Sequence, residues 1–130
     1  MALDPLGHYR LLEQIGSGGM GAVYRAHDER LDRDVAIKVL HSGTDCGQSA
    51  GGRLLEEARS ASHLNHPHIC TIYEVGEENG IAFIVMEYVA GRPMSKIIPA
   101  GGLSSEQVIH YAIQIADAFG PCPSAAHRAW

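Results

Sequence analysis

The sequence predicts an α+β fold, in which an antiparallel sheet of about five strands carries one helix and further helix follows. Three observations support this prediction. Several short segments alternate apolar and polar residues, which is the period of a strand. Turns rich in glycine or in charged residues separate these segments. Two other segments repeat apolar residues every three or four positions, which is the period of a helix.

The first three predicted strands surround a glycine-rich turn and a charged turn. Residues 9–15 alternate loosely and lead into the glycine-rich residues 16–21, after which a strand-like pattern resumes at 22–26. This pattern predicts a hairpin with a glycine-rich tip. Residues 28–34 are almost wholly charged and predict an exposed turn before the apolar strand 35–40.

A helix is predicted next, after a flexible loop at residues 42–52 that is rich in Gly, Ser, Thr and Asp. The helix covers residues 53–64, where Asn65, His66 and Pro67 stop it. Five residues of this helix fall within an arc of about 120° and so form one face. Its members are Leu54, Glu57, Ala58, Ala61 and Leu64. Glu57 is therefore predicted on the buried face.

The last predicted elements are two strands and a second helix. The strands cover residues 69–75 and 81–89, joined by a turn at 76–80. Ser104 and Gln107 have the spacing of a capping box, in which each side chain hydrogen-bonds the other's backbone N–H. Apolar residues at helical spacing follow as far as Phe119: Val108, Tyr111, Ala112 and Ile115.

Composition excludes several classes of protein. The chain has 130 residues, with 10 Lys and Arg against 15 Asp and Glu and a formal net charge of −5, which argues against binding to nucleic acid or to anionic membranes. We find no membrane segment, since no apolar stretch approaches the roughly 20 residues that a spanning helix needs. The first ten residues do not resemble a signal peptide, and the three cysteines form no CxxC pair. These observations predict a cytoplasmic protein.

The eight histidines raise the question of a metal site. His63, His66 and His68 lie close together in the sequence, but Pro67 interrupts any helix that would present two of them on one face. A polar helix end followed by a turn explains them better, so no metal-ligating residue is predicted.

The glycine-rich turn carries a G-x-G-x-x-G pattern. Dinucleotide-binding folds use the same pattern, but there a helix follows the last glycine, whereas here the strand beginning near Val23 follows it. A hairpin tip of this kind exposes backbone N–H groups that suit a phosphate chain. An ordinary flexible hairpin is the alternative when the turn is considered alone.

Lys38 is the charged residue of an otherwise apolar strand, where a charge is costly without a partner. Glu57 is the candidate partner, and a lysine held by a carboxylate is positioned to hold phosphate oxygens. The pair alone is explained equally well as a structural salt bridge. Ala36 is small and lies on the same strand face as Lys38, which leaves room for a flat ring.

Taken together, these residues resemble the eukaryotic-type protein kinase family, and most closely its bacterial serine/threonine members. The matching segments occur in the family's order between residues 9 and 119. They are the glycine-rich loop 16–23, V-A-I-K at 35–38, Glu-Glu-Ala at 56–58, Asn-His-Pro-His-Ile at 65–69, the hinge 85–89 with Met86 as gatekeeper, and the first long helix of the large lobe, 103–119.

The resemblance implies a kinase small lobe at residues 1–90 and the start of a large lobe at 91–119, with ATP as the ligand. Lys38 would hold the α- and β-phosphates, and Glu57 would orient Lys38. The main chain of Glu87 and Val89 would bind the adenine edge. The full set of implied nucleotide-binding residues is Ile15, Gly16, Ser17, Gly18, Gly19, Gly21, Val23, Ala36, Lys38, Met86, Glu87 and Val89.

The catalytic Asp, the Asn and the D-F-G motif of the family have no counterpart in this sequence. Mg²⁺ is expected for the family, but its ligands are therefore missing here. We expect weak nucleotide binding and no phosphoryl transfer unless a large lobe is supplied to present a protein substrate. One allowed codon choice from residue 118 onward, read one base later, resembles the approach to a kinase catalytic loop. Residues 120–130 are therefore predicted to be a frameshifted or disordered tail.

Three other interpretations stay open at this point. The chain could be a non-catalytic, pseudokinase-like interaction module that pairs with and regulates a full-length kinase. It could also be a product that does not fold stably. A Rossmann oxidoreductase is the third, and the strand that follows Gly21 argues against it.

Overall fold

The computed structural model describes residues 5–18, 21–40, 55–56 and 58–120. The chain divides into two compact units. The first holds the described residues up to 63 together with 70–89, and the second holds 64–69 and the described residues from 90 onward.

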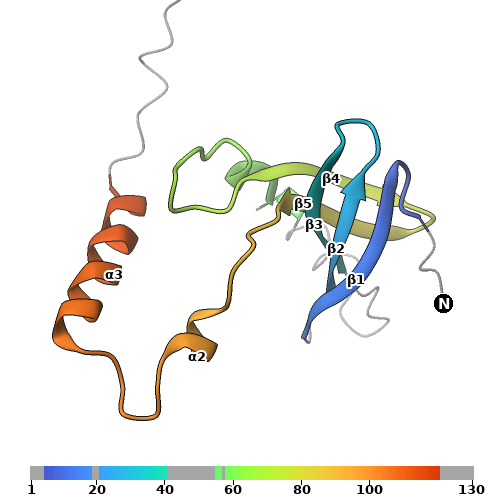
Figure 1. Cartoon of the computed structure of the whole chain (residues 1–130). Helices are drawn as coiled ribbons and strands as arrows, with labels where there is room; N and C mark the ends of the chain where they lie inside the picture. The colour runs from blue at the N-terminus through green and yellow to red at the C-terminus, as the bar shows by residue number, and fades with distance from the viewer. Residues whose placement is uncertain (1–4, 19–20, 41–54, 57, 121–130) are drawn as a thin grey trace, which may run out of the picture. The chain divides into compact units, whose positions relative to one another are not determined.

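A five-stranded antiparallel sheet forms the first unit (Figure 1). Its strands are β1 (Tyr9–Gly18), β2 (Gly21–Asp28), β3 (Arg33–Leu40), β4 (Ile72–Glu78) and β5 (Ile81–Glu87). The strand order across the sheet is β1-β2-β3-β5-β4. Residues 55–56 and 58–61 are helical. This architecture confirms the predicted fold class.

The strands differ from their predicted bounds at two turns. β2 extends to Asp28 and β3 begins at Arg33, so the exposed turn is shorter than predicted. The prediction that Asp28 lies in an exposed turn was wrong, because Asp28 is 1% exposed and accepts hydrogen bonds from the backbone N–H groups of Arg30 and Leu31. β4 and β5 likewise extend into the predicted turn at 76–80 and meet at Asn79 and Gly80.

One face of the sheet forms the hydrophobic core. Its buried members are Leu6, Tyr9, Ala26, Val35, Ile37, Phe83 and Val85. Tyr9 packs edge-on against Phe83, with 6.5 Å between ring centroids, and its hydroxyl donates a hydrogen bond to Glu74 at 2.5 Å. Burial, and then the neighbouring carboxylate, raise the pKa of Tyr9. The core therefore ties β1 to β4, which lie at opposite edges of the sheet.

The helical residues of the first unit agree with the predicted face where they are described. Ala58 is buried and Ala61 is half-buried. Leu54 and Glu57 lie outside the described residues, so the predicted burial of Glu57 is not tested.

The second unit contains two helices, α2 (Met94–Ile97) and α3 (Ser105–Ala118). The single turn of α2 was not predicted. The capping box of α3 is confirmed: the Ser104 hydroxyl accepts from the Gln107 N–H at 3.3 Å, and the Gln107 side chain accepts from the Ser104 N–H at 3.0 Å. His66 contacts Asp117 near the end of α3, with 3.2 Å between Nε2 and Oδ2.

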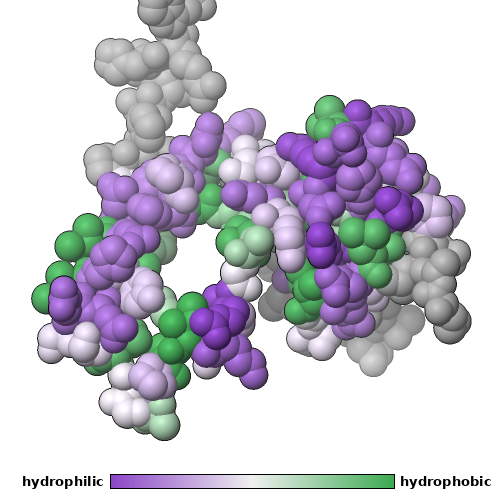
Figure 2. Space-filling view, viewed as in Figure 1, coloured by the Kyte–Doolittle hydropathy of each residue, from purple (hydrophilic) through white to green (hydrophobic). Residues whose placement is uncertain are grey.

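No residue of α3 is buried. Hydrophobic side chains therefore lie on its surface among hydrophilic ones (Figure 2). The exposed ones are Val108, Ile109, Ile113 and Ile115, followed by Phe119. Of the predicted apolar face, Val108, Ile115 and Phe119 are exposed and Tyr111 is half-buried, whereas Ile109 and Ile113 lie outside that face. Of the predicted tail 120–130, all but Gly120 lies outside the described residues.

Candidate nucleotide site

The glycine-rich segment forms the end of the β1–β2 hairpin, as predicted. Gly16 pairs with Val23, Ser17 with Ala22 and Gly18 with Gly21. The strand register shifts between Gln14 and Gly16, so Ile15 lies in a bulge, where it is 47% exposed. Gly19 lies outside the described residues.

Two glycines of this hairpin differ in the space around them. Gly21 has φ +146°, and a Cβ there would collide with the carbonyl oxygen of Val39. A side chain is therefore excluded at Gly21 by the close approach of β3. Among the described residues, no atom lies within 4 Å of a Cβ built on Gly18, so the backbone here is open to the rest of the described sheet. An open backbone of this kind leaves N–H groups accessible to a phosphate oxygen.

Lys38 lies on the sheet face opposite the core. It pairs with Val23 of β2 on one side and with Ile84 of β5 on the other. Directly paired residues of antiparallel strands carry their side chains on the same face. Lys38 is half-buried. Because Glu57 lies outside the described residues, the predicted Lys38–Glu57 pair stays a prediction.

Ala36 of β3 is paired with Met86 of β5 on the same face, two residues along each strand from the Lys38–Ile84 pair. Ala36 is 5% exposed and Met86 is half-buried. The register thus gathers one set of side chains, called here the Lys38 face: Val23, Arg25, Ala36, Lys38, Ile84 and Met86. The predicted site residues Val23, Ala36 and Lys38 lie together on this face, and β5 adds Met86.

Some backbone hydrogen-bonding groups of the segment that follows Met86 are already bonded within the sheet unit. The Glu87 N–H donates to the Thr71 carbonyl at 2.8 Å, and the Glu87 carboxylate accepts from the Thr71 N–H at 3.3 Å. The Glu87 carbonyl accepts a weak bond from the Cys70 thiol at 3.5 Å. Burial, and then the Glu87 charge, raise the pKa of that thiol. A carbonyl has a second lone pair, so the Glu87 oxygen still has an acceptor position, and Val89 is 64% exposed.

Sequence reasoning missed an ionic network on the Lys38 face. Arg25 donates through Nε and Nη2 to the same Asp34 oxygen, at 3.0 and 2.6 Å, and through Nη1 to Glu13 at 3.2 Å. The Arg25 guanidinium also lies over the Tyr88 ring, 5.1 Å from its centroid. His27 contacts the other oxygen of Asp34 at 3.1 Å.

The network changes the ionisation of its members. Hydrogen bonds from Arg25 and then from His27 lower the pKa of Asp34, and the bonds to Asp34 and Glu13 raise the pKa of Arg25. A signal is present in the sequence, since Arg25 and His27 alternate on one strand and Asp34 is the second residue of the next. The signal was missed because Asp34 was predicted to lie in the charged turn 28–34, whereas it is paired with His27 in the sheet.

Comparison with known proteins identifies the family. Residues 9–125 match the protein kinase domain. The chain belongs to this family. Its resemblance to bacterial serine/threonine kinases is also confirmed. Over 113 residues it is 44% identical to the serine/threonine-protein kinase PrkC of Bacillus subtilis, a match that covers 86% of this chain. Over 128 residues it is 37% identical to PknA of Mycobacterium tuberculosis, covering 95% of this chain.

Solved kinase domains show the same fold. A double mutant of the Mycobacterium tuberculosis PknI kinase domain superposes with a TM-score of 0.76 and 28% identity, over 91% of this kinase chain. The match spans 49% of that domain, and the chain spans 17% of PrkC and 29% of PknA. It therefore corresponds to part of its relatives.

Two further findings concern the described residues of this kinase chain. No helix among them is long and apolar enough to cross a bilayer. They also contain no group of three or more His, Cys, Asp or Glu side chains placed to hold a metal ion.

Proposed function

We propose that this chain is the ATP-binding portion of a serine/threonine protein kinase. The observation that carries the proposal is the Lys38 face: one sheet surface joins the glycine hairpin, a half-buried lysine and the small Ala36 opposite Met86. Membership of the kinase family and identity to serine/threonine kinases support the same interpretation.

The residues on this face suit the three parts of ATP. The backbone of the hairpin would cover the phosphates: Gly18 is open, and Gly16, Ser17, Gly19 and Gly21 complete the pattern. Lys38 would hold the α- and β-phosphate oxygens by charge-assisted hydrogen bonds, oriented by Glu57. ATP when bound supplies the phosphoryl group; the chain's own residues bind and orient it.

The adenine ring would lie against apolar side chains. Ile15, Val23 and Ala36 would pack on one side of the ring, and Met86 would limit the depth of the site. The Glu87 carbonyl would accept from the exocyclic amine, since its N–H is already bonded to Thr71. The exposed Val89 would offer its backbone N–H to a ring nitrogen.

Isothermal titration calorimetry of the 130-residue chain with ATP tests the proposal by measuring the dissociation constant. The charge-assisted contacts of Lys38 predict that Lys38→Ala weakens ATP binding by about tenfold. The matched control is Lys96→Ala, which removes the other lysine of the chain, on α2. Equal loss in both variants, or no loss in Lys38→Ala, would contradict the proposal.

Phosphoryl transfer by these 130 residues alone is not expected, because they carry no counterpart of the family's catalytic Asp, Asn or D-F-G. Incubation with labelled ATP and a generic peptide measures this. Phosphorylation that Lys38→Ala abolishes would show the expectation to be wrong. For a longer product we propose protein serine or threonine as the substrate.

The exposed hydrophobic residues of α3 favour a second candidate function, a non-catalytic module that pairs with a full-length kinase. Sedimentation of the chain with and without a full-length bacterial serine/threonine kinase separates the two. A defined one-to-one complex would favour the module, and its absence together with ATP binding would favour the nucleotide-binding portion.

A further inference from the structure

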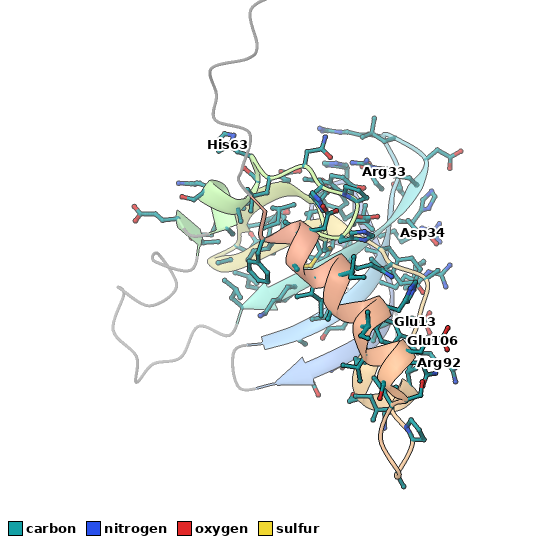
Figure 3. The ribbon with its side chains drawn as sticks, turned by 90° about the vertical axis from the view of Figure 1, so that its left-hand side faces the viewer. Glu13, Arg33, Asp34, His63, Arg92 and Glu106 are labelled. Atoms are coloured by element: carbon teal, nitrogen blue, oxygen red, sulfur yellow. The ribbon has the colours of Figure 1, made fainter. Side chains whose placement is uncertain are left out.

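Arg25 makes more connections than its place in β2 requires. Its guanidinium bonds Glu13 of β1 and Asp34 of β3, the strands on either side, and it stacks on Tyr88 beyond the end of β5. Glu13 and Asp34 are labelled in Figure 3. One side chain thus joins three segments that are separate in the sequence.

Two of these segments carry the backbone that we assign to ATP. Glu13 lies between two register shifts of β1, two residues before the bulge at Ile15 that leads into the glycine hairpin. Shifted register leaves the ladder irregular at this point, so a side-chain contact has more influence on where the strand lies. Arg25 supplies that contact at 3.2 Å.

Tyr88 lies between Glu87 and Val89, the residues assigned to the adenine edge. The ladder between β5 and β3 ends at the pairing of Glu87 with Val35, so Tyr88 lies beyond the paired residues. The Arg25 guanidinium over its ring at 5.1 Å is within the range of a cation–π contact. This contact holds the segment from the side of β2.

We propose that Arg25 is a positioning residue for the nucleotide site: held by Glu13 and Asp34 on the neighbouring strands, it fixes the adenine-binding backbone through its contact with Tyr88. This inference rests on the proposed function. The residue type fits the task. A planar guanidinium can donate to two carboxylates while its face lies on an aromatic ring, whereas a lysine ammonium can do neither with the same geometry.

The test compares ATP with inorganic tripolyphosphate, which lacks the base and the ribose. Variants are Arg25→Met, Tyr88→Ala and the conservative Tyr88→Phe, which keeps the ring. Arg30→Met is the matched control, since Arg30 is exposed in the β2–β3 turn. Loss of the stack and of both ion pairs predicts that Arg25→Met weakens ATP binding by about fivefold and tripolyphosphate binding by less than about twofold.

Each outcome decides something. Loss for ATP but not for tripolyphosphate, with Tyr88→Phe restoring wild-type affinity, supports positioning of the adenine edge. Equal loss for both ligands shows that only positive charge was removed, and unchanged ATP binding shows that Arg25 positions nothing; either result overturns the proposal.

A second measurement separates this proposal from the proposed function. Backbone amide NMR shifts of Glu87, Tyr88 and Val89 are recorded without nucleotide. Arg25→Met and Tyr88→Ala should move them, and Tyr88→Phe and Arg30→Met should leave them within the wild-type spread. Unmoved shifts in Arg25→Met would overturn the inference. Wild-type chain that binds no ATP but shows the expected shifts would overturn the proposed function alone.

Discussion

Ala36 of β3 lies directly opposite Met86 of β5, on the sheet face that carries Lys38. The pairing sets the smallest side chain of that strand against a long, flexible thioether. Space at this point is therefore governed by Met86, which has rotamers available that a branched residue lacks.

Shortening Met86 should widen the site. We expect Met86→Ala to keep ATP affinity within about threefold and to admit an ATP analogue with a bulky group on the exocyclic amine, because side-chain volume beside the ring is removed. Competition binding with the analogue measures this. The matched control is Val75→Ala on β4, an apolar truncation paired with Ile84 rather than with Ala36. Exclusion of the analogue by Met86→Ala would show that Met86 does not border the adenine.

Substitutions at two glycines of the hairpin should differ in their effect on stability, because only one of them is in close contact with β3. Gly21→Ala places a Cβ against the Val39 carbonyl at a φ of +146°, so we expect a loss of about 2–4 kcal/mol in the free energy of unfolding. Gly18→Ala is the control, because no atom of the described residues lies within 4 Å of its added Cβ, and it should change stability by less than about 0.5 kcal/mol. Urea denaturation of both variants measures the difference. Similar losses at the two positions would contradict the close approach of β3 to β2 at Gly21.

Asp28 should make stability depend on acid. Burial works to raise the pKa of Asp28, but the N–H groups of Leu31 and Arg30, with the nearby charges of His8 and Arg33, outweigh it and lower the pKa in the folded state. Its ionised form therefore stabilises the fold above the unfolded pKa near 3.8, and this contribution is lost as the pH falls through the lower folded pKa.

Asp28→Asn should cost about 1–3 kcal/mol near neutral pH, since a buried charged acceptor is replaced. Below about pH 4 the difference from wild type should shrink as Asp28 becomes protonated. The control is Asp32→Asn in the same turn, whose side chain is 96% exposed and whose positive φ asparagine tolerates. A difference that stays constant between pH 7 and pH 3 would rule out the ionic contribution.

The capping box should control the start of α3. Ser104→Ala removes the acceptor for the Gln107 N–H, so we expect about 1 kcal/mol less protection of the first-turn amides of α3 from hydrogen exchange. Ser105→Ala, one residue later, lies inside the helix and should leave protection equal or higher. Equal effects in the two variants would mean that the cap contributes nothing.

Much of the fold could be predicted because local signals agreed with it. The alternating strand at 35–40, the glycine tip and the Ser104–Gln107 cap are each visible over a few residues and appear where they were expected. The strand ends could not be placed so well. Charged Asp28 and Asp34 have the character of solvent-exposed residues, whereas the backbone N–H groups of the following turn bind the first and Arg25 binds the second.

That some candidate site residues share one sheet face was predictable for a different reason. Lys38, Ala36 and Val23 share a face because strand alternation and register are simple rules, so the motif alone placed them. The Arg25 network depends on which strands become neighbours and on a contact with Tyr88, 63 residues further along the chain. No local pattern encodes that encounter.

The strand order has a consequence for how the sheet assembles. β1, β2 and β3 follow one another in space and in sequence, and β4 pairs with β5 across a two-residue turn, so three of the four strand pairings are local. Only the pairing of β3 with β5 joins residues far apart in the sequence, from Val39 with Phe83 to Val35 with Glu87, a separation of about 44 to 52 positions. On a ribosome the three-stranded meander can close first and the later hairpin can add to it as a unit, so loop-closure entropy for the sheet is concentrated in a single step.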